Sequence, residues 1–152
     1  LAGAAGSRRL IGGQMEDLLA ENKVDATAAE LEFIHLNKTA AMIEAALVMG
    51  GLNGNAPATT LASLRDTGRH LGLAFQIIDD VLDATADSAT LGKTAGKDAR
   101  AGKTTYVQLH GVEGSRRIAR EHTESALRML AELPGEKTFL AALVESLARR
   151  AA

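Results

Sequence analysis

The sequence predicts an all-α protein with a single domain of about five helices. Three observations carry this prediction: alanine and leucine are abundant in a chain that is 46% hydrophobic, aromatic residues make up only 3% of it, and runs of β-branched residues are scarce. Such a composition favours packed helices over sheets. With 152 residues, the chain is long enough to bury a hydrophobic core.

Two helices are predicted in the N-terminal third of the chain. A helical pattern covers Ser7–Glu21 and starts in mid-pattern. A second helix covers Thr27–Met49, because Thr27 and Glu30, three residues later, form the pattern of a capping box. We expect the pair Gly50 and Gly51 to end this helix, since glycine is typical of helix C-termini.

Three further helices are predicted downstream. The third runs from about Pro57 to Asp83, and the fourth covers Ser115–Leu133, where a proline and a glycine stop it. The fifth covers Glu136–Arg150 and has a helical apolar face made of Phe139, Leu140, Leu143, Val144 and Leu147. A long connection rich in glycine and lysine, residues 84–106, separates the third helix from the fourth. Connections of this length inside a domain are usually functional or disordered.

Composition excludes several classes of protein. The formal net charge of −2 does not suggest a nonspecific nucleic-acid surface. The chain has no cysteine, which excludes disulfides and thiolate metal sites and fits a reducing cytoplasm. No apolar run approaches the ~18 residues of a membrane span, and no signal peptide opens the sequence. We therefore expect a cytoplasmic location without stable membrane insertion.

One lysine falls on the apolar face of the second helix. The apolar residues of this face recur at steps of three and four, and they are Leu31, Ile34, Met42, Ala45 and Met49. Lys38 lies on the same stripe, four residues after Ile34 and four before Met42. A lysine in this position either extends its ammonium group to water or meets an anion.

Acidic side chains gather on one face near the end of the third helix. At steps of three and four, this face carries Gly72, Gln76, Asp79 or Asp80, and Asp83. The carboxylates of Asp79 and Asp83 are about one turn apart, and hard oxygen ligands at this spacing suit Mg²⁺. An isolated D-D-x-x-D is more often a solvated helix end. Here the flanking residues are apolar, and the connection that follows carries basic residues, namely Lys93, Lys97, Arg100 and Lys103. Together these groups indicate a diphosphate site.

Two glycines interrupt the interior of the third helix. Gly68 and Gly72 each cost about 1 kcal/mol of helix stability relative to alanine. We therefore expect another helix, or a ligand, to approach the backbone closely at these positions.

The segment "FQIIDDVLD" followed by "LGKTAGKDARAGKTTY" closely resembles the second aspartate-rich motif of the trans-type polyprenyl diphosphate synthases, which include the farnesyl and geranylgeranyl diphosphate synthases. Two further segments match in the family's order, "GGQMEDL" at Gly12–Leu18 and "IHLNKTAAMI" at Ile34–Ile43. The resemblance implies antiparallel helices around a deep apolar pocket, in a homodimer. It also implies Mg²⁺-dependent head-to-tail condensation of isopentenyl diphosphate with an allylic diphosphate (dimethylallyl, geranyl or farnesyl).

The resemblance assigns roles to the matching residues. It implies that Asp79, Asp80 and Asp83 bind Mg²⁺, and that Lys38 and Lys93 contact the allylic diphosphate. It further implies that Thr39 and Gln76 turn their oxygens toward the developing cation, so that Lys38, Thr39 and Gln76 form the catalytic group. The remaining substrate-binding residues that it implies are Phe75, on the isopentenyl side, Gln14, near the hydrocarbon, and Asp17, in the polar network.

The sequence departs from this family in one respect. The family needs a first D-D-x-x-D on an earlier helix, and this sequence contains no other. We therefore expect residues 1–152 to be the C-terminal part of a single synthase domain of roughly twice this length. Helices that face the absent part would then expose apolar stripes, including those within residues 31–49 and 64–82.

Three other functions are to be weighed against this one. The segment "GKDARAGKT" has five residues between Gly96 and Gly102, where a P-loop allows four, and no strand precedes it. Terpene cyclases share the fold but lack the arrangement "FQxxDDxxD…GK". A noncatalytic half-synthase, or a regulatory subunit that binds a complete synthase, remains open. The retention of the lysines, the glutamine and the aspartates named above argues against an inactive partner.

Overall fold

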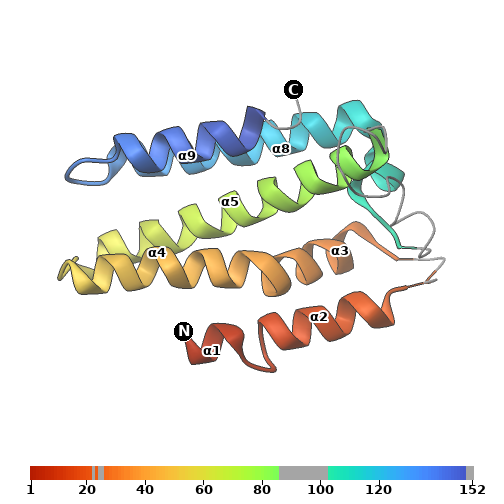
Figure 1. Cartoon of the computed structure of the whole chain (residues 1–152), viewed down its shortest axis with the longest axis horizontal. Coiled ribbons are helices and arrows are strands. Elements are labelled where there is room, and N and C mark those ends of the chain that lie inside the picture. Colours follow the sequence, from red (N-terminus) through yellow and green to blue (C-terminus); the bar gives the residue numbers. More distant parts are fainter. Residues whose placement is uncertain (22, 24–25, 86–102, 150–152) are drawn as a thin grey trace.

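The computed structural model describes residues 1–21, 23, 26–85 and 103–149, and every regular element in these ranges is helical (Figure 1). In chain order the elements are α1 (Ala2–Ala5), α2 (Leu10–Leu19), α3 (Ala28–His35), the π-helical turn η1 (Leu36–Ala40), α4 (Ala41–Asn53), α5 (Ala58–Thr85), α8 (Tyr106–Glu132) and α9 (Thr138–Ala148). The predicted all-α class is confirmed. Within the described ranges, no helix combines the length and the apolarity that a bilayer crossing requires.

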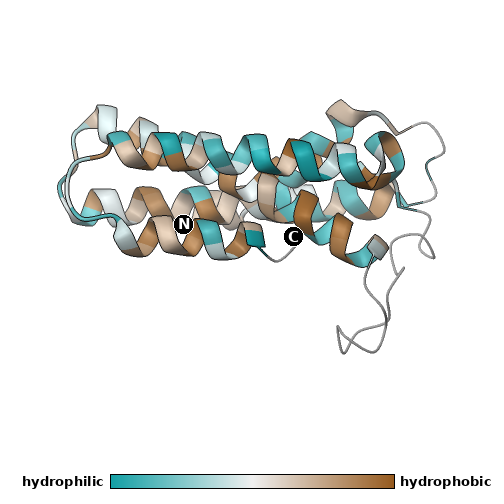
Figure 2. Ribbon diagram, turned by 90° about the horizontal axis from the view of Figure 1, so that it is seen from above, coloured by the Kyte–Doolittle hydropathy of each residue, from teal (hydrophilic) through white to brown (hydrophobic). Residues whose placement is uncertain are grey.

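The central element of the bundle is α5, a helix of 28 residues. It lies between α8 and α9 on one side and α3 and α4 on the other, and α1 and α2 form the outermost layer beside α3 and α4 (Figure 1). Hydrophobic and hydrophilic residues alternate along the helices, as amphipathic packing requires (Figure 2). One buried cluster consists of Leu64, Leu71, Ala126, Leu130, Leu133 and Val144, and a second of Leu31, Ile77, Ile78, Tyr106 and Ala119. Residues of α5 belong to both clusters, so this helix joins them.

Capping boxes begin two of the helices. At the start of α3, the Thr27 hydroxyl accepts a hydrogen bond from the Glu30 N–H (3.3 Å), and the Glu30 carboxylate accepts one from the Thr27 N–H (2.9 Å), which confirms the predicted cap. A second capping box, Thr105 with Gln108, begins α8 at Tyr106. The predicted start at Ser115 is therefore wrong. The cause is Gly111, whose φ of 70° kinks α8 and interrupts its pattern.

Two other predicted boundaries also need correction. Gly50 and Gly51 lie inside α4, which ends at Asn53. A Cβ atom on Gly51 would lie 2.6 Å from a methyl carbon of Leu64, so this glycine serves the packing of α4 on α5 and does not end a helix. The first predicted helix, Ser7–Glu21, is shorter in the structure, where α2 covers Leu10–Leu19.

Gly68 and Gly72 allow the close approach that their positions predict. A Cβ atom on Gly68 would lie 2.6 Å from the Cα atom of Glu44 in α4. A Cβ atom on Gly72 would overlap Ala40, the last residue of η1. Another segment of the chain, not a ligand, therefore occupies the space beside both glycines.

The expected exposure of the apolar stripes within residues 31–49 and 64–82 holds only in part. Within the first range, Met49 is 41% and Phe33 54% exposed. Leu31, Ile34, Leu64, Leu71 and Ile78 are all buried, because the chain's own helices cover them. A further exposed apolar stripe lies on α2, and it consists of Ile11, Met15, Leu18 and Leu19, which are 52–62% exposed. On α9, Val144 is buried and two leucines pack partly against it, whereas Phe139 is 77% exposed.

We predict opposite effects for two glycine-to-alanine substitutions in helices. Gly72→Ala should lower the free energy of unfolding by about 1–3 kcal/mol, because its new methyl group overlaps Ala40. Gly50→Ala should raise it by up to about 1 kcal/mol, because no atom lies within 4 Å of the new methyl group and alanine is the better helix former. Urea denaturation measures both changes, and a Gly72→Ala chain as stable as the parent would contradict the packing of α5 on η1.

Candidate functional site

Lys38 and Thr39 lie in η1, a five-residue π-helical turn between α3 and α4. A π-turn contains more residues than an α-helical turn, and such turns are frequent at functional sites. It therefore breaks the three- and four-residue steps on which the predicted stripe through Lys38 was based. Within this turn Lys38 is half-buried, and its side chain does not continue the apolar face.

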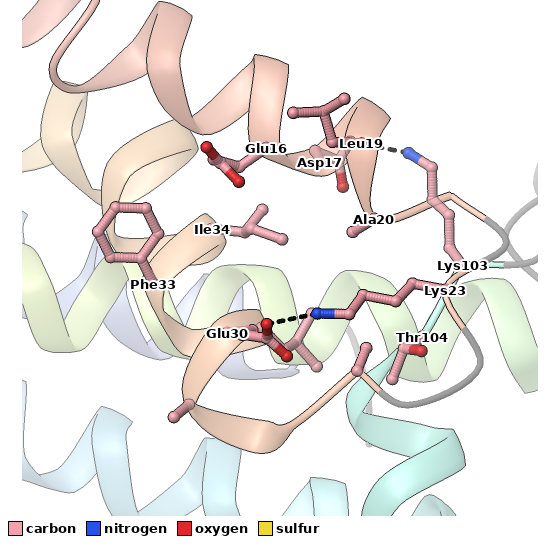
Figure 3. A pocket seen from close by; sticks show the side chains of 13 residues that line it. Glu16, Asp17, Leu19, Ala20, Lys23, Glu30, Phe33, Ile34, Lys103 and Thr104 are labelled. Carbon is pink, nitrogen blue, oxygen red and sulfur yellow. Dashed lines mark hydrogen bonds and ion pairs between the residues drawn. The ribbon is translucent and has the colours of Figure 1, made fainter.

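The anion that Lys38 meets is a carboxylate of its own chain. The ammonium group of Lys38 donates a hydrogen bond to Oδ2 of Asp17 at 2.8 Å, and the ammonium group of Lys103 donates to the same oxygen at 2.8 Å. Lys103 also lies 3.6 Å from Glu21. Figure 3 shows Asp17, on α2, facing Lys103. Lys38 and Lys103, which are distant in the sequence, thus bring their positive charges together at one carboxylate of α2.

Burial and the two lysines act on Asp17 in opposite directions. Burial of the Asp17 carboxyl raises its pKa, but the hydrogen bonds and charges of Lys103 and Lys38 outweigh this effect, so that the pKa lies below its ordinary value. Asp17 is therefore ionised at neutral pH and neutralises part of the charge of the two lysines.

The aspartates of α5 differ in their surroundings. Asp79 is exposed, whereas Asp80 and Asp83 are half-buried, as are Phe75 and Gln76 one turn before them. Oδ2 of Asp80 accepts a hydrogen bond from the backbone N–H of Tyr106 at 2.8 Å. Within the described ranges, no group of three or more acidic or histidine side chains has the geometry of a metal site. The structure therefore offers carboxylates at helical spacing, not a preformed cage of protein ligands.

The structure brings together only some of the predicted site residues. Asp17 and Lys38 form an ion pair, and the contact of Gly72 with Ala40 brings η1, with Thr39, against α5, which carries Gln76. Gln14 is exposed on α2. Lys93 lies outside the described residues. Lys103 is, in the sequence, one of several basic residues of the long connection. In the structure it completes the charged cluster, which consists of Asp17, Lys38, Lys103 and Glu21.

A cavity of about 320 Å³ opens beside the charged cluster (Figure 3). Its walls come from α2, α3 and the residues before α8, and its lining residues are Glu16, Asp17, Leu19, Ala20, Lys23, Ala26, Ala29, Glu30, Leu31, Phe33, Ile34, Lys103 and Thr104. The aspartates of α5 do not line it. Most of its lining lies within residues 16–34, and Lys103 and Thr104 join it from a distant part of the sequence.

Histidines take part in two contacts that the sequence does not reveal. His35, 6% exposed, stacks on Tyr106 with ring centroids 5.5 Å apart, and its Nδ1 atom has no hydrogen-bond partner in the described structure. Burial lowers the pKa of His35 to about 4. His70 on α5 and His122 on α8 share a hydrogen bond of 2.8 Å between their Nδ1 atoms, and burial lowers the pKa of both. The hydrogen bond between His70 and His122 requires at least one neutral ring, whose Nδ1 atom accepts the proton of the other.

Comparison with known proteins gives consistent matches. The model of the family described as polyprenyl synthetase matches residues 4–143. The chloroplastic geranylgeranyl pyrophosphate synthase of Catharanthus roseus is 43% identical over 151 residues, which are 99% of this chain and 42% of that protein. A decaprenyl diphosphate synthase structure from Rhodobacter capsulatus has a TM-score of 0.86 at 29% identity, covering 99% of this chain and 58% of that one.

A further similar structure contains bound ligands. The geranyltransferase of Helicobacter pylori, complexed with magnesium and isoprenyl diphosphate, has a TM-score of 0.77 at 28% identity and covers 97% of this chain and 49% of that one. The chain thus spans between 42% and 58% of the length of these three proteins.

We predict that Asp17→Ala destabilises the chain by about 1–2 kcal/mol at pH 7, because two largely buried ammonium groups lose their shared partner. Glu16→Ala is the matched control, since Glu16 precedes Asp17 on α2, is exposed and also lines the cavity. Its effect should stay within about 0.5 kcal/mol. Equal free energies of unfolding for the two variants would show that the ion pairs with Asp17 contribute nothing.

The buried histidines predict a loss of stability in mild acid. A histidine whose pKa is lowered by folding contributes stability that is complete above pH 6.5 and lost as the pH falls, because only the unfolded chain then binds the proton. With a pKa of about 4, His35 alone should account for about 2 kcal/mol between pH 7.5 and 5.

The variant His35→Phe keeps an aromatic ring against Tyr106 and does not titrate. Its free energy of unfolding should therefore fall less than that of the parent over the same pH range. Parallel pH profiles of parent and variant, measured by urea denaturation, would contradict a neutral, buried His35.

Proposed function

This chain belongs to the polyprenyl synthetase family, and on that premise we propose that residues 1–152 are the C-terminal part of a synthase domain. The proposed reaction is the Mg²⁺-dependent head-to-tail condensation of isopentenyl diphosphate with an allylic diphosphate (dimethylallyl, geranyl or farnesyl). One arrangement carries this proposal. Lys38 and Lys103 both bind Asp17, and η1, which contains Lys38, packs directly against α5, the helix that carries the aspartates.

The carboxylates of α5 suit the proposed metal. Asp79 and Asp83 are four residues apart on one helix face, and Asp80 lies between them. Mg²⁺ keeps several waters and commonly takes other ligands from substrate phosphates, so it does not need a complete cage of protein oxygens. When bound, the ion would neutralise the charge of the diphosphate leaving group. The magnesium in the related geranyltransferase structure supports the choice of metal.

The basic residues would hold and orient the diphosphate. Lys38, Lys103 and Lys93 would bind its oxygens, with Lys38 and Lys103 already close together on Asp17. As the carbon–oxygen bond of the allylic substrate breaks, its electron pair stays on the leaving diphosphate and an allylic cation forms. The oxygens of Thr39 and Gln76 would stabilise this cation.

The remaining steps need a pocket that excludes water. The double bond of isopentenyl diphosphate attacks the cation, a proton is lost, and the products are a diphosphate one isoprene unit longer and free diphosphate. Phe75 would provide an apolar surface on the isopentenyl side, and Gln14 would lie near the hydrocarbon chain. We also propose a homodimer and a cytoplasmic location. The name of the Catharanthus relative places that protein in the chloroplast, so cell fractionation tests the location.

A noncatalytic role is the second candidate, and the exposed apolar stripe of α2 favours it. Ile11, Met15, Leu18 and Leu19 form a surface on which another subunit could pack. Turnover by the chain alone would exclude this role. Turnover that appears only after a complete synthase is added, and exceeds that of the synthase alone, would support it.

We predict that Asp79→Ala in the synthase that contains this chain lowers turnover by at least two orders of magnitude, because a proposed Mg²⁺ ligand is lost. Asp66→Ala is the control on the same helix. Asp66 is exposed and pairs only weakly with Arg69 at 3.4 Å, so its removal should change turnover less than about twofold. Steady-state assays measure both, and equal rates for Asp79→Ala and the parent would remove the site assignment.

A further inference from the structure

Tyr106 is the first residue of α8 and lies where three segments meet. Tyr106 is 6% exposed and belongs to the core cluster that contains Leu31 of α3 and Ile77 of α5. Lys103, which pairs with Asp17, precedes it by three residues. Tyr106 therefore touches both segments that carry the proposed diphosphate site, although the sequence motif that ends at this residue gives it no role.

The backbone of Tyr106 holds one of the aspartates. Its N–H donates a 2.8 Å hydrogen bond to Oδ2 of Asp80. The first N–H groups of a helix have no partner within the helix, and they lie at its positive end, where a carboxylate is a favourable acceptor. This contact fixes the start of α8 to the aspartate segment of α5.

The ring of Tyr106 reaches the segment that carries Lys38. It stacks on His35, with centroids 5.5 Å apart and planes 25° apart, and His35 is the last residue before η1. A buried stack limits how far both rings can move, because the interior around them is closely packed. One residue thus connects the aspartates of α5 with the π-turn.

We propose that Tyr106 is a positioning residue of the diphosphate site, and that Asp80 serves as its hydrogen-bond acceptor and not as a metal ligand. This inference rests on the proposed function. It separates the three aspartates by role, because Asp79 and Asp83, at i and i+4 on one helix face, remain as the pair that would hold the ion. Asp80, one residue after Asp79, points to a different side of α5 and ties that helix to α8.

The backbone hydrogen bond can be removed by substitution. Proline is favoured as the first residue of a helix, and the preceding Thr105 has the extended backbone (φ −124°, ψ 164°) that proline requires. Tyr106→Ala removes the ring and keeps the N–H, whereas Tyr106→Pro removes both. The two variants also differ in backbone rigidity, so the contribution of the N–H group is the change in their difference between the Asp80 and the Asp80→Ala backgrounds.

The first measurement is thermal unfolding of these four variants. We expect the melting temperature of Tyr106→Pro, relative to that of Tyr106→Ala, to be about 2–4 °C lower when Asp80 is present than when residue 80 is alanine. A difference of equal size in both backgrounds would overturn the proposal, because the N–H would then not depend on Asp80.

The second measurement is the binding of inorganic diphosphate, by calorimetry with and without Mg²⁺, at a temperature where every variant is folded. Asp80→Asn keeps a carbonyl oxygen that can accept the Tyr106 N–H, so its affinity should stay within about twofold of the parent. Asp80→Ala should bind about tenfold more weakly. Asp79→Asn, which loses a proposed metal ligand, should lose at least as much, and only in the presence of Mg²⁺.

The outcomes separate the two proposals. If Asp80→Asn binds as weakly as Asp79→Asn, Asp80 is a metal ligand and the positioning role is overturned. If the synthase that contains this chain shows no Mg²⁺-dependent binding of diphosphate while the coupling between residues 80 and 106 persists in unfolding, the proposed function is overturned. Rescue by Asp80→Asn together with coupled unfolding supports both proposals.

Discussion

The close approach of two helices to the π-turn η1 sets the geometry of the candidate site. A Cβ atom on Gly13 of α2 would lie 2.5 Å from the backbone nitrogen of Lys38, and one on Gly72 of α5 would overlap Ala40. The turn η1 therefore packs between the backbones of α2 and α5, at a glycine of each helix. Any side chain at either glycine would push a helix away, and Asp17 or the aspartate segment would move with it. Packing thus determines where the charges lie, and the charges contribute stability only within that packing.

The two lysines that bind Asp17 are positioned so that an anionic ligand could replace this carboxylate as their partner. Asp17 holds two ammonium groups that would otherwise repel each other in a half-buried place. In the proposed function, a diphosphate is a stronger competitor for the same groups, because it offers several charged oxygens where Asp17 offers one carboxylate. The lysines are then already close together when the substrate arrives, so less freedom of motion is lost on binding.

Local patterns in the sequence predict what depends on neighbours in the chain. The Thr27–Glu30 cap, the close approach at Gly68 and Gly72 and the acidic face of α5 follow from spacings of three or four residues. The π-turn could not be predicted, because tertiary contacts impose its extra residue on a helical pattern. The early start of α8 was hidden by the kink at Gly111. The contacts of Lys103 with Asp17 and of His70 with His122 join residues more than fifty positions apart, and no local pattern reports them.

The position of the three aspartates within α5 has a consequence for the helix itself. They occupy the last two turns of a 28-residue helix whose final turn has no basic residue. The aligned peptide dipoles concentrate partial negative charge at this end, so each carboxylate there opposes the helix that carries it. In the proposed function, a metal ion bound at this end would relieve that repulsion. Cation binding there and the stability of the last turns of α5 would then be thermodynamically coupled, so that each strengthens the other.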